Sequence, residues 1–384
     1  MERARLAELE AAGLYDPQAA NAADRLALLE WLVERGITLE QLVRARDDES
    51  PLTGLAGDLA LRGDERLTLA DAAIASGLTA ADVEAMRLAA GLPPVDATTP
   101  AFTDGDATAL AGFLAASALF GREPVLQYLR VIGSALARIA EAGVSLFTRT
   151  VEIVIRRADA GELALASANL EAMRALEILP PVIQSILRWH LEVAISRFRQ
   201  GRDPQSLETA RLTVGFVDVV GFTPLARTKS MHDLGVIVDR FEAITSDVAA
   251  AHGGRVVKLI GDAVMFVTVR SADACEIALT LIERFGADGV VTPRGGLACG
   301  PILARAGDYY GATVNLASRI GDLAVPNEIL VTAELAADAA AAQPAAARGA
   351  AASPTRATYR FEPAGKRMLK GFDKPVPLLS LARA

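Results

Sequence analysis

Apolar residues recur at two different spacings along the chain, and the change of spacing separates two halves. From residue 24 to about residue 199 they follow the three-to-four spacing of one helix face, as in "ADRLALLEWLVERGI" and "LPPVIQSILRWHLEVAISRF". Beyond residue 210, short β-rich apolar runs alternate with helical segments. The pattern predicts an α+β chain with an all-helical first half and a mixed second half.

A polar stretch, "RQGRDPQSLETA", lies between the two patterns at residues 199–210. Its Gly, Pro, Asp and Ser content is typical of a loop or linker. We therefore predict a helical domain over residues 1–199, a linker over 200–210 and a second domain over 211–384.

The second half opens with a strand, a helix and a hairpin. The apolar run "RLTVGFVDVVGFT" leads into Asp218, and an amphipathic helix follows from Met231 to His252. Next comes "GGRVVKLIGDAVMFVTV", residues 253–269, a hairpin with its tight turn at Gly-Asp. This order of elements can bring Asp262 at the turn beside Asp218 at the end of the first strand.

Lys258 and Asp262 interrupt the apolar hairpin, and burying such charges without partners costs several kcal/mol. Two neighbouring carboxylates, Asp218 and Asp262, repel each other unless a cation lies between them. Mg²⁺ suits such a pair because it binds few carboxylates and completes its shell with water and phosphate oxygens. The spacing is equally consistent with two unrelated solvated acids, one of them an ordinary turn aspartate.

A second polar group lies in "AGDYYGATVNLASRI", residues 306–320. Asn315 and Arg319 are four residues apart in a predicted helix and so project from one face. An amide and a guanidinium aimed at one point suit the negative charge that develops on phosphorus. Asp308 lies just upstream. The alternative is a helix cap followed by a solvated arginine.

Composition indicates an intracellular protein with ordinary cores. Of 384 residues, 52% are hydrophobic and 22% charged, enough to build two domains. The two cysteines, Cys275 and Cys299, are too few for a disulfide framework, and the start lacks a signal peptide. The apolar run between Asp106 and Arg122 is shorter than a membrane span of roughly 18–20 residues. We predict a cytoplasmic protein without a transmembrane segment, hydrophobic enough for an apolar ligand or for membrane association.

Charge argues against nucleic acid as a partner. Residues 1–200 carry 19 arginines and 28 acidic residues, whereas phosphate contacts need an excess of basic residues. The segment from Leu67 to Pro94, with Gly77 at a turn, resembles a helix-turn-helix, but its own net charge is negative. A DNA-binding regulator is therefore the weaker alternative.

Four motifs of the second half together resemble the class III nucleotide cyclases: "FVDVVGFT", "GGRVVKLIGDAVMF", "DYYGATVNLASR" and "MLKGF". They occur in the order and spacing of that family across nearly all of residues 211–384. The resemblance implies a ferredoxin-like βαββαβ fold and a homodimer with active sites at its interface. It also implies a lyase that converts ATP to cyclic AMP with two Mg²⁺ or Mn²⁺ ions.

The same resemblance implies a role for each matching residue. Asp218 and Asp262 match the metal ligands. Lys258 and Asp308 match the pair that recognises adenine, where guanylate cyclases usually carry Glu and Cys. Asn315 and Arg319 match the transition-state pair. Lys370, in "LKGF", matches a phosphate-binding lysine, and the Ala-rich segment 333–359 upstream of it, predicted as a helix and a loop, departs from the family pattern.

The first half, over roughly residues 5–200, resembles the helical regulatory domain of soluble, autoinhibited, acid-responsive mycobacterial cyclases. The resemblance implies regulation by pH or by an apolar ligand. His190 lies in the last predicted helix and is a candidate for the pH response because histidine titrates near neutrality. The pattern favours the alternative, a partly buried histidine without a switching role. A second alternative for the whole chain is an inactive cyclase-like domain that only binds nucleotide.

Overall fold

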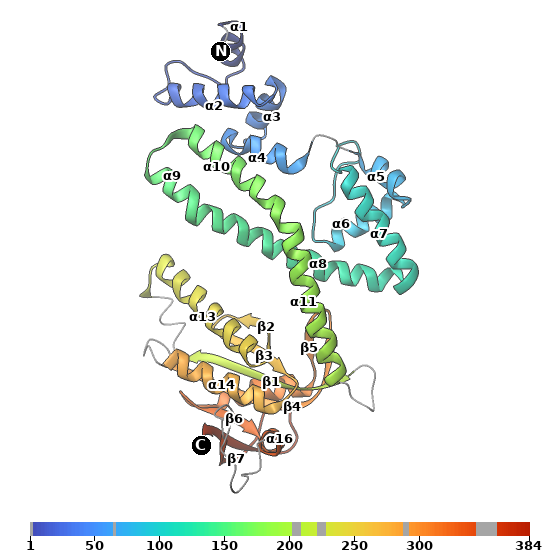
Figure 1. Ribbon diagram of the computed structural model, residues 1–384, viewed down its shortest axis with the longest axis vertical. Coiled ribbons are helices and arrows are strands. Elements are labelled where there is room, and N and C mark those ends of the chain that lie inside the picture. The colour runs from blue at the N-terminus through green and yellow to red at the C-terminus, as the bar shows by residue number, and fades with distance from the viewer. Residues whose placement is uncertain (1–2, 64–66, 202–208, 221–227, 287–291, 343–358) are drawn as a thin grey trace. The chain divides into compact units, whose positions relative to one another are not determined.

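The computed structural model describes residues 3–63, 67–201, 209–220, 228–286, 292–342 and 359–384. Its contacts divide the chain into two compact units, Met1–Arg188 and Trp189–Ala384 (Figure 1). Helix α11, Leu179–Gln200, runs across this division. Most of the predicted linker, residues 202–208, lies outside the described residues.

The first unit is helical, as its spacing of apolar residues predicts, with one isolated bridge between Leu67 and Phe102. Several helices begin at a threonine whose side chain accepts a hydrogen bond from the third residue of the helix, as at Thr38 and Thr103. The helical segments before α11 are α1 (Arg3–Ala11), α2 (Ala22–Glu34), α3 (Leu39–Asp47), α4 (Leu52–Arg62), α5 (Leu69–Ser76), α6 (Ala80–Ala89), α7 (Asp104–Phe120), α8 (Arg122–Phe147), the π-helical η1 (Thr148–Glu152), α9 (Ile153–Arg157), α10 (Gly161–Ala175) and the 3₁₀ segment η2 (Leu176–Ile178).

Two separate apolar cores hold these helices. One gathers side chains of α1 to α4 and α10, and the other gathers side chains of α5 to α8. Within the second core, α5 and α6 are joined through Gly77, whose φ of 72° suits a residue without a side chain. The helix pair that the helix-turn-helix resemblance predicts is therefore present.

One helical stretch, Arg122–Arg157, is long and apolar enough to cross a membrane, and little of its most apolar window is buried. It comprises α8, η1 and α9, and it lies beyond the shorter run on which the sequence prediction relied. Length and composition are equally typical of a soluble helix that packs against a partner. The absence of a transmembrane segment therefore remains a prediction.

The second unit is built on a mixed sheet in the order β2-β3-β1-β4-β6-β8-β7, with β5 paired to β4. Its first part follows the path β1-α13-β2-β3-α14-β4, which is the predicted ferredoxin-like βαββαβ unit. The elements are β1 (Thr209–Val220), α13 (Met231–Ala251), β2 (Arg255–Ile260), β3 (Ala263–Thr268), α14 (Ser271–Gly286), β4 (Thr292–Arg305), β5 (Asp308–Tyr310), α15 (Ala312–Leu323), β6 (Ile329–Thr332), α16 (Ala333–Ala341), β7 (Tyr359–Arg367) and β8 (Val376–Arg383).

Helices cover both faces of this sheet. Side chains of α13, α14 and α16 pack on one face, and side chains of α15 pack on the other. Gly296 lets α15 approach β4 closely, since an added Cβ would lie 2.2 Å from the backbone nitrogen of Gly321. The backbone contact fixes the helix that carries Asn315 and Arg319 against the sheet.

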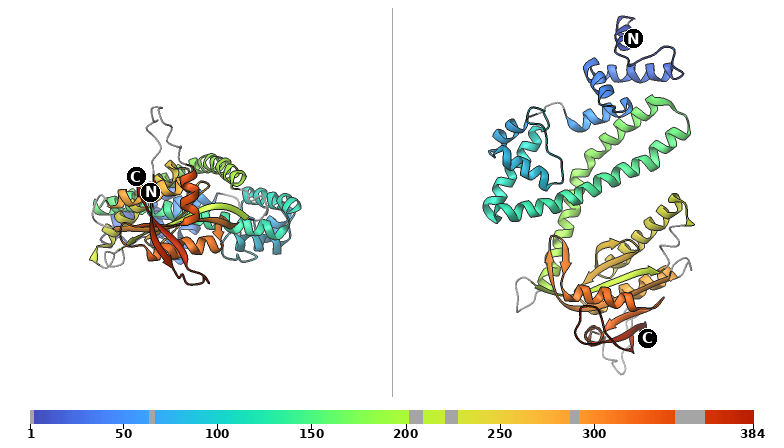
Figure 2. Two further views of the ribbon diagram at one scale, coloured as in Figure 1. Left: turned by 90° about the horizontal axis from the view of Figure 1, so that it is seen from below. Right: turned by 180° about the vertical axis from the view of Figure 1, so that it is seen from behind.

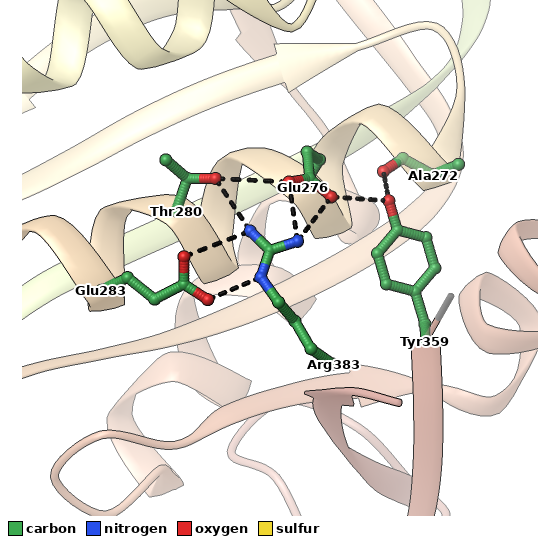
Figure 3. Close-up of polar contacts among 6 residues, drawn as sticks. All are labelled: Ala272, Glu276, Thr280, Glu283, Tyr359 and Arg383. Atoms are coloured by element: carbon green, nitrogen blue, oxygen red, sulfur yellow. Dashed lines mark hydrogen bonds and ion pairs between the residues drawn. The ribbon is translucent and has the colours of Figure 1, made fainter. Parts of the chain in front are cut away.

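The last strands are tied to α14 by a polar network (Figure 3). Arg383 of β8 donates from Nε to Glu283 at 2.6 Å and pairs with Glu276 at 2.8 Å. The hydroxyl of Tyr359, on β7, donates toward Glu276 and the carbonyl oxygen of Ala272. The Ala-rich segment begins as the predicted helix, α16, and residues 343–358 lie outside the described part of the chain.

Candidate active site

The two predicted metal ligands lie at one end of the sheet. Asp218 is on β1 directly opposite Ala263, the first residue of β3, and the backbone N–H of Val219 donates to the carbonyl oxygen of Asp262 at 3.2 Å. Asp262 follows Gly261, whose φ of 63° makes the predicted two-residue turn. The structure therefore brings Asp218 and Asp262 together as the pattern of strand, helix and hairpin predicts.

The two neighbouring carboxylates favour binding of a proton or a cation. Burial raises the pKa of Asp262, and the neighbouring charge of Asp218 raises it further. Among the described residues no third Asp, Glu, His or Cys joins them in a metal-binding group. Mg²⁺ or Mn²⁺ fits two such carboxylates, with water and phosphate oxygens as its other ligands.

Arg294 is a site residue that the sequence interpretation missed. It lies opposite Asp218 on β4, and its guanidinium contacts the Asp218 carboxylate at 3.2 Å. The same group donates to the carbonyl oxygens of Asp322 and Ala324, while its buried Nε has no hydrogen-bond partner among the described residues. A basic residue at the start of an otherwise apolar run was the available signal, but only the strand register shows its partner.

The predicted adenine-binding residues form a direct ion pair. Lys258 on β2 donates from Nζ to Oδ2 of Asp308 on β5 at 2.6 Å. The other oxygen of Asp308 accepts from the backbone N–H of Tyr309 at 2.8 Å. Burial alone would raise the pKa of Asp308, but these hydrogen bonds outweigh burial and lower it, so the carboxylate is ionised at neutral pH.

Asn315 and Arg319 are exposed on one face of α15, as their spacing predicts. Arg319 lies 3.5 Å from the carboxylate of Asp322 in the next turn. Within the described part of the chain, neither side chain makes a hydrogen bond or ion pair with Asp218, Asp262 or the Lys258–Asp308 pair. The pair is therefore available to a ligand.

Lys370 is exposed in the turn that follows β7. Its neighbour Leu369 is buried, and the carbonyl oxygen of Leu369 accepts a hydrogen bond from the N–H of Phe372 at 3.0 Å. This turn anchors the "LKGF" segment to the core and leaves the lysine ammonium in solvent.

The candidate residues of one chain lie at opposite ends of β4. Asp218 is in register with Arg294 near the beginning of that strand, and Asp308 is in register with Arg305 at its end. Consequently the aspartate pair lies beside the beginning of β4, and the Lys258–Asp308 pair is a separate group beside its end.

Two family models match almost the whole chain. The adenylate cyclase regulatory domain matches residues 7–195, and the adenylate and guanylate cyclase catalytic domain matches residues 205–371. Together they account for the helical half and for the mixed sheet.

Relatives also match most of this chain. An uncharacterised protein of Mycobacterium tuberculosis is 35% identical over 97% of this chain and 93% of its own length. An adenylate cyclase of Streptomyces coelicolor is 33% identical over 83% of this chain and 78% of its own. A pH-sensitive adenylate cyclase of Mycobacterium tuberculosis is 32% identical over 80% of this chain and 78% of its own.

Among solved structures, the adenylyl cyclase CyaB of P. aeruginosa is 24% identical, with a TM-score of 0.37, and the match covers 46% of this chain and 97% of that one. The fold and the full-length relatives define a class III nucleotide cyclase domain preceded by a helical regulatory domain. This chain belongs to the adenylate cyclases of that family.

Proposed function

We propose that the protein converts ATP to 3′,5′-cyclic AMP and pyrophosphate at sites shared between two copies of the chain. The observation that carries the choice of ATP is the ion pair of Lys258 with Asp308, 2.6 Å apart. This pair offers one donor, on β2, and one acceptor, on β5, side by side. Adenine presents the complementary pattern, an acceptor at N1 beside the 6-amino donor.

Guanine would not satisfy the same pair. Its O6 is an acceptor and would face the ionised carboxylate of Asp308, while its N1–H donor would face the ammonium of Lys258. A polar site that leaves both partners mismatched discriminates strongly between substrates. Selection of ATP over GTP follows from these two side chains.

Asp218 and Asp262 would hold the two Mg²⁺ or Mn²⁺ ions. When bound, the ions supply positive charge that lowers the pKa of the ribose 3′-hydroxyl and neutralises charge on the triphosphate. The 3′-oxygen bonds to the α-phosphorus, its proton leaves to solvent, and the bond to pyrophosphate breaks. Arg319 and Asn315 would stabilise the oxygen charge on the α-phosphoryl group, and Lys370 would bind the leaving phosphates.

A homodimer explains why the two groups of residues lie apart in one chain. The aspartates of one copy would face the base and transition-state residues of the other, so that a symmetric pair contains two complete sites. Exposed apolar side chains of α11, including Trp189, Leu191 and Val193, provide surface that a second copy could cover. No side chain of α11 is buried by the described residues of a single chain.

The regulatory half is proposed to restrain the catalytic half, in response to pH or to an apolar ligand. Helix α11 belongs to both units and ends at β1, where the N–H of Arg211 donates to the carbonyl oxygen of Gly201 at 2.8 Å. A shift of this helix would move the strand that carries Asp218. His190 is exposed on α11 and remains the candidate for the pH response. The protein is proposed to be cytoplasmic.

The test is formation of cyclic AMP by the purified full chain with ATP and Mn²⁺. Asp262→Asn should lower kcat/KM by about 100-fold or more, because one ligand of the cation is lost. Asp338→Asn, at an exposed position on α16, is the matched control and should retain the wild-type rate. Absence of cyclic AMP from the dimeric wild-type protein would support the alternative of an inactive nucleotide sensor.

A further inference from the structure

The pairing of β2 with β3 contains an irregularity beside the base-binding pair. Arg255 is opposite Val267, Val256 is opposite Phe266, and Lys258 is opposite Met265, so Val257 is the extra residue of a β-bulge. The bulge lies one residue before Lys258. It therefore decides to which face of the sheet the lysine points.

Without the bulge, Arg255 and Lys258 would point to opposite faces, because alternate residues of a strand share a face. With it, they oppose Val267 and Met265, which are two residues apart and belong to the same core cluster. Val256 belongs with the core on the other face. The bulge therefore places two basic side chains on one face of β2.

Arg255 reaches the turn that carries Asp308. Its guanidinium donates to the carbonyl oxygen of Gly307 at 2.8 Å and to the hydroxyl of Tyr309 at 3.4 Å, and its central carbon lies 5.6 Å from the centre of the Tyr309 ring. Gly307 and Tyr309 are the residues on either side of Asp308. Arg255 thus contacts the backbone just before the proposed adenine acceptor and the side chain of the residue just after it.

The turn between β4 and β5 needs such support. Ala306 and Gly307, its two central residues, have φ values of 52° and 78°, the left-handed conformation of a type I′ turn. Alanine adopts this conformation at a cost. The hydrogen bond from Arg255, on β2, to Gly307 stabilises the turn, in addition to the pairing of Arg305 with Asp308.

We infer that Arg255 is a positioning residue for base recognition, which holds Asp308 where it faces Lys258 and the 6-amino group of adenine. The inference rests on the proposed use of ATP. Lys258 fixes Oδ2 of Asp308, the Tyr309 N–H fixes Oδ1, and Arg255 holds the carbonyl group of the preceding residue, Gly307. Arg255 makes no contact with the reacting phosphates in this arrangement.

Three variants test the inference by kinetics. Arg255→Met removes all contacts with the turn, Arg255→Lys retains the charge but only one donor group, and Tyr309→Phe removes only the hydroxyl. For Arg255→Met we expect KM for ATP to rise and the ATP-to-GTP ratio of kcat/KM to fall about tenfold, below the roughly 100-fold effect of a full ångström of misplacement. Arg255→Lys should be intermediate and Tyr309→Phe mildest, with kcat changed least throughout.

Arg360→Met is the matched control, since Arg360 lies on β7 and, within the described residues, its ion pair is with exposed Glu362. It should leave both KM and the substrate ratio unchanged. Folded Arg255 variants with the wild-type KM and ATP-to-GTP ratio, or with a lower kcat alone, would overturn the inference. If Arg255→Met does not fold, Arg255→Lys and Tyr309→Phe decide the same question.

A binding measurement separates this inference from the proposed function. The probes are α,β-methylene ATP and α,β-methylene GTP, which bind without turnover. Suppose that the protein makes no cyclic AMP but binds the ATP analogue selectively, and that this binding weakens in the Arg255 variants. The result would support the positioning role of Arg255 and contradict the proposed cyclase activity. Equal binding of the two probes by the wild-type protein would contradict both.

Discussion

At the scale of single residues, the side chain of Lys258 is 42% exposed in an otherwise apolar hairpin, and its ammonium group lies 2.6 Å from Asp308. If this pair selects the base, replacing it with Lys258→Glu and Asp308→Cys should depress ATP use by about 100-fold or more, since both polar partners of adenine become mismatched. The measurement is kcat/KM for ATP and for GTP. Unchanged ATP use in the folded double variant would assign base selection to other residues.

Asp262 gives a prediction of pH dependence. Burial and the charge of Asp218 raise its pKa, so protons compete with a cation for this carboxylate at higher pH than for an ordinary aspartate. Affinity for Mn²⁺ should therefore fall as pH falls toward the raised pKa and level off above it. Titration of free Mn²⁺ by electron paramagnetic resonance between pH 5 and 8 measures this directly. An affinity independent of pH, or equal in Asp262→Asn, would contradict the site.

At the scale of elements, the clamp of Arg383 on α14 should contribute to the stability of the catalytic unit (Figure 3). Arg383→Met removes the ion pairs with Glu276 and Glu283, of which Glu276 keeps its hydrogen bond from Tyr359, and should lower the free energy of unfolding by about 1–2 kcal/mol. For a unit of this size the midpoint of thermal unfolding then falls by about 2–8 °C. Circular dichroism of the full chain measures the change. Arg360→Met, which breaks an exposed ion pair with Glu362, should have little effect. Equal losses of stability in both variants would contradict a stabilising role for the Arg383 contacts.

The elements themselves were largely predictable from local patterns. Helix α13 begins at Met231 as predicted, because Ser230 caps it and its apolar face is periodic. The hairpin turn at Gly261 was predictable because glycine there supplies the positive φ. These features depend on residues that are near one another in the sequence.

Contacts set by strand register were not predictable in the same way. The pairing of Arg294 with Asp218 depends on the alignment of β4 with β1, and the contact of Arg255 with Gly307 depends on a bulge and on a distant turn. A shift of one residue in either strand would point these side chains to the other face. The register of two strands that are distant in the chain cannot be determined from a single sequence.

At the scale of the whole molecule, α11 connects the helical unit with the unit that carries the proposed base-binding residues. Arg197 near its end lies beside Tyr309 and Arg255, where burial lowers the pKa of its guanidinium and the charge of Arg255 adds to that effect. The rear view in Figure 2 shows the β4–β5 hairpin next to the end of this helix. Movement of α11 could therefore reach the turn that holds Asp308.

Autoinhibition predicts a difference between the full chain and the fragment Trp189–Ala384, which retains the contacts of α11 with the sheet. We expect higher specific activity in the fragment, and activity of the full chain that rises as pH falls from 8 to 5.5. His190→Ala should reduce the rise if protonation of this exposed side chain opposes the restrained state. Equal activities of chain and fragment at every pH would contradict autoinhibition. A retained acid response in His190→Ala would contradict only the role of this histidine.

Complementation between two inactive chains tests the central claim most directly. Asp218→Ala and Asn315→Ala should each make almost no cyclic AMP alone, because every site of each homodimer lacks an essential side chain. After subunit exchange in an equal mixture, half of the dimers are mixed and each contains one intact site, so about a quarter of the wild-type activity should return. No recovery, with exchange confirmed by differently tagged chains, would contradict an ATP site shared between two copies.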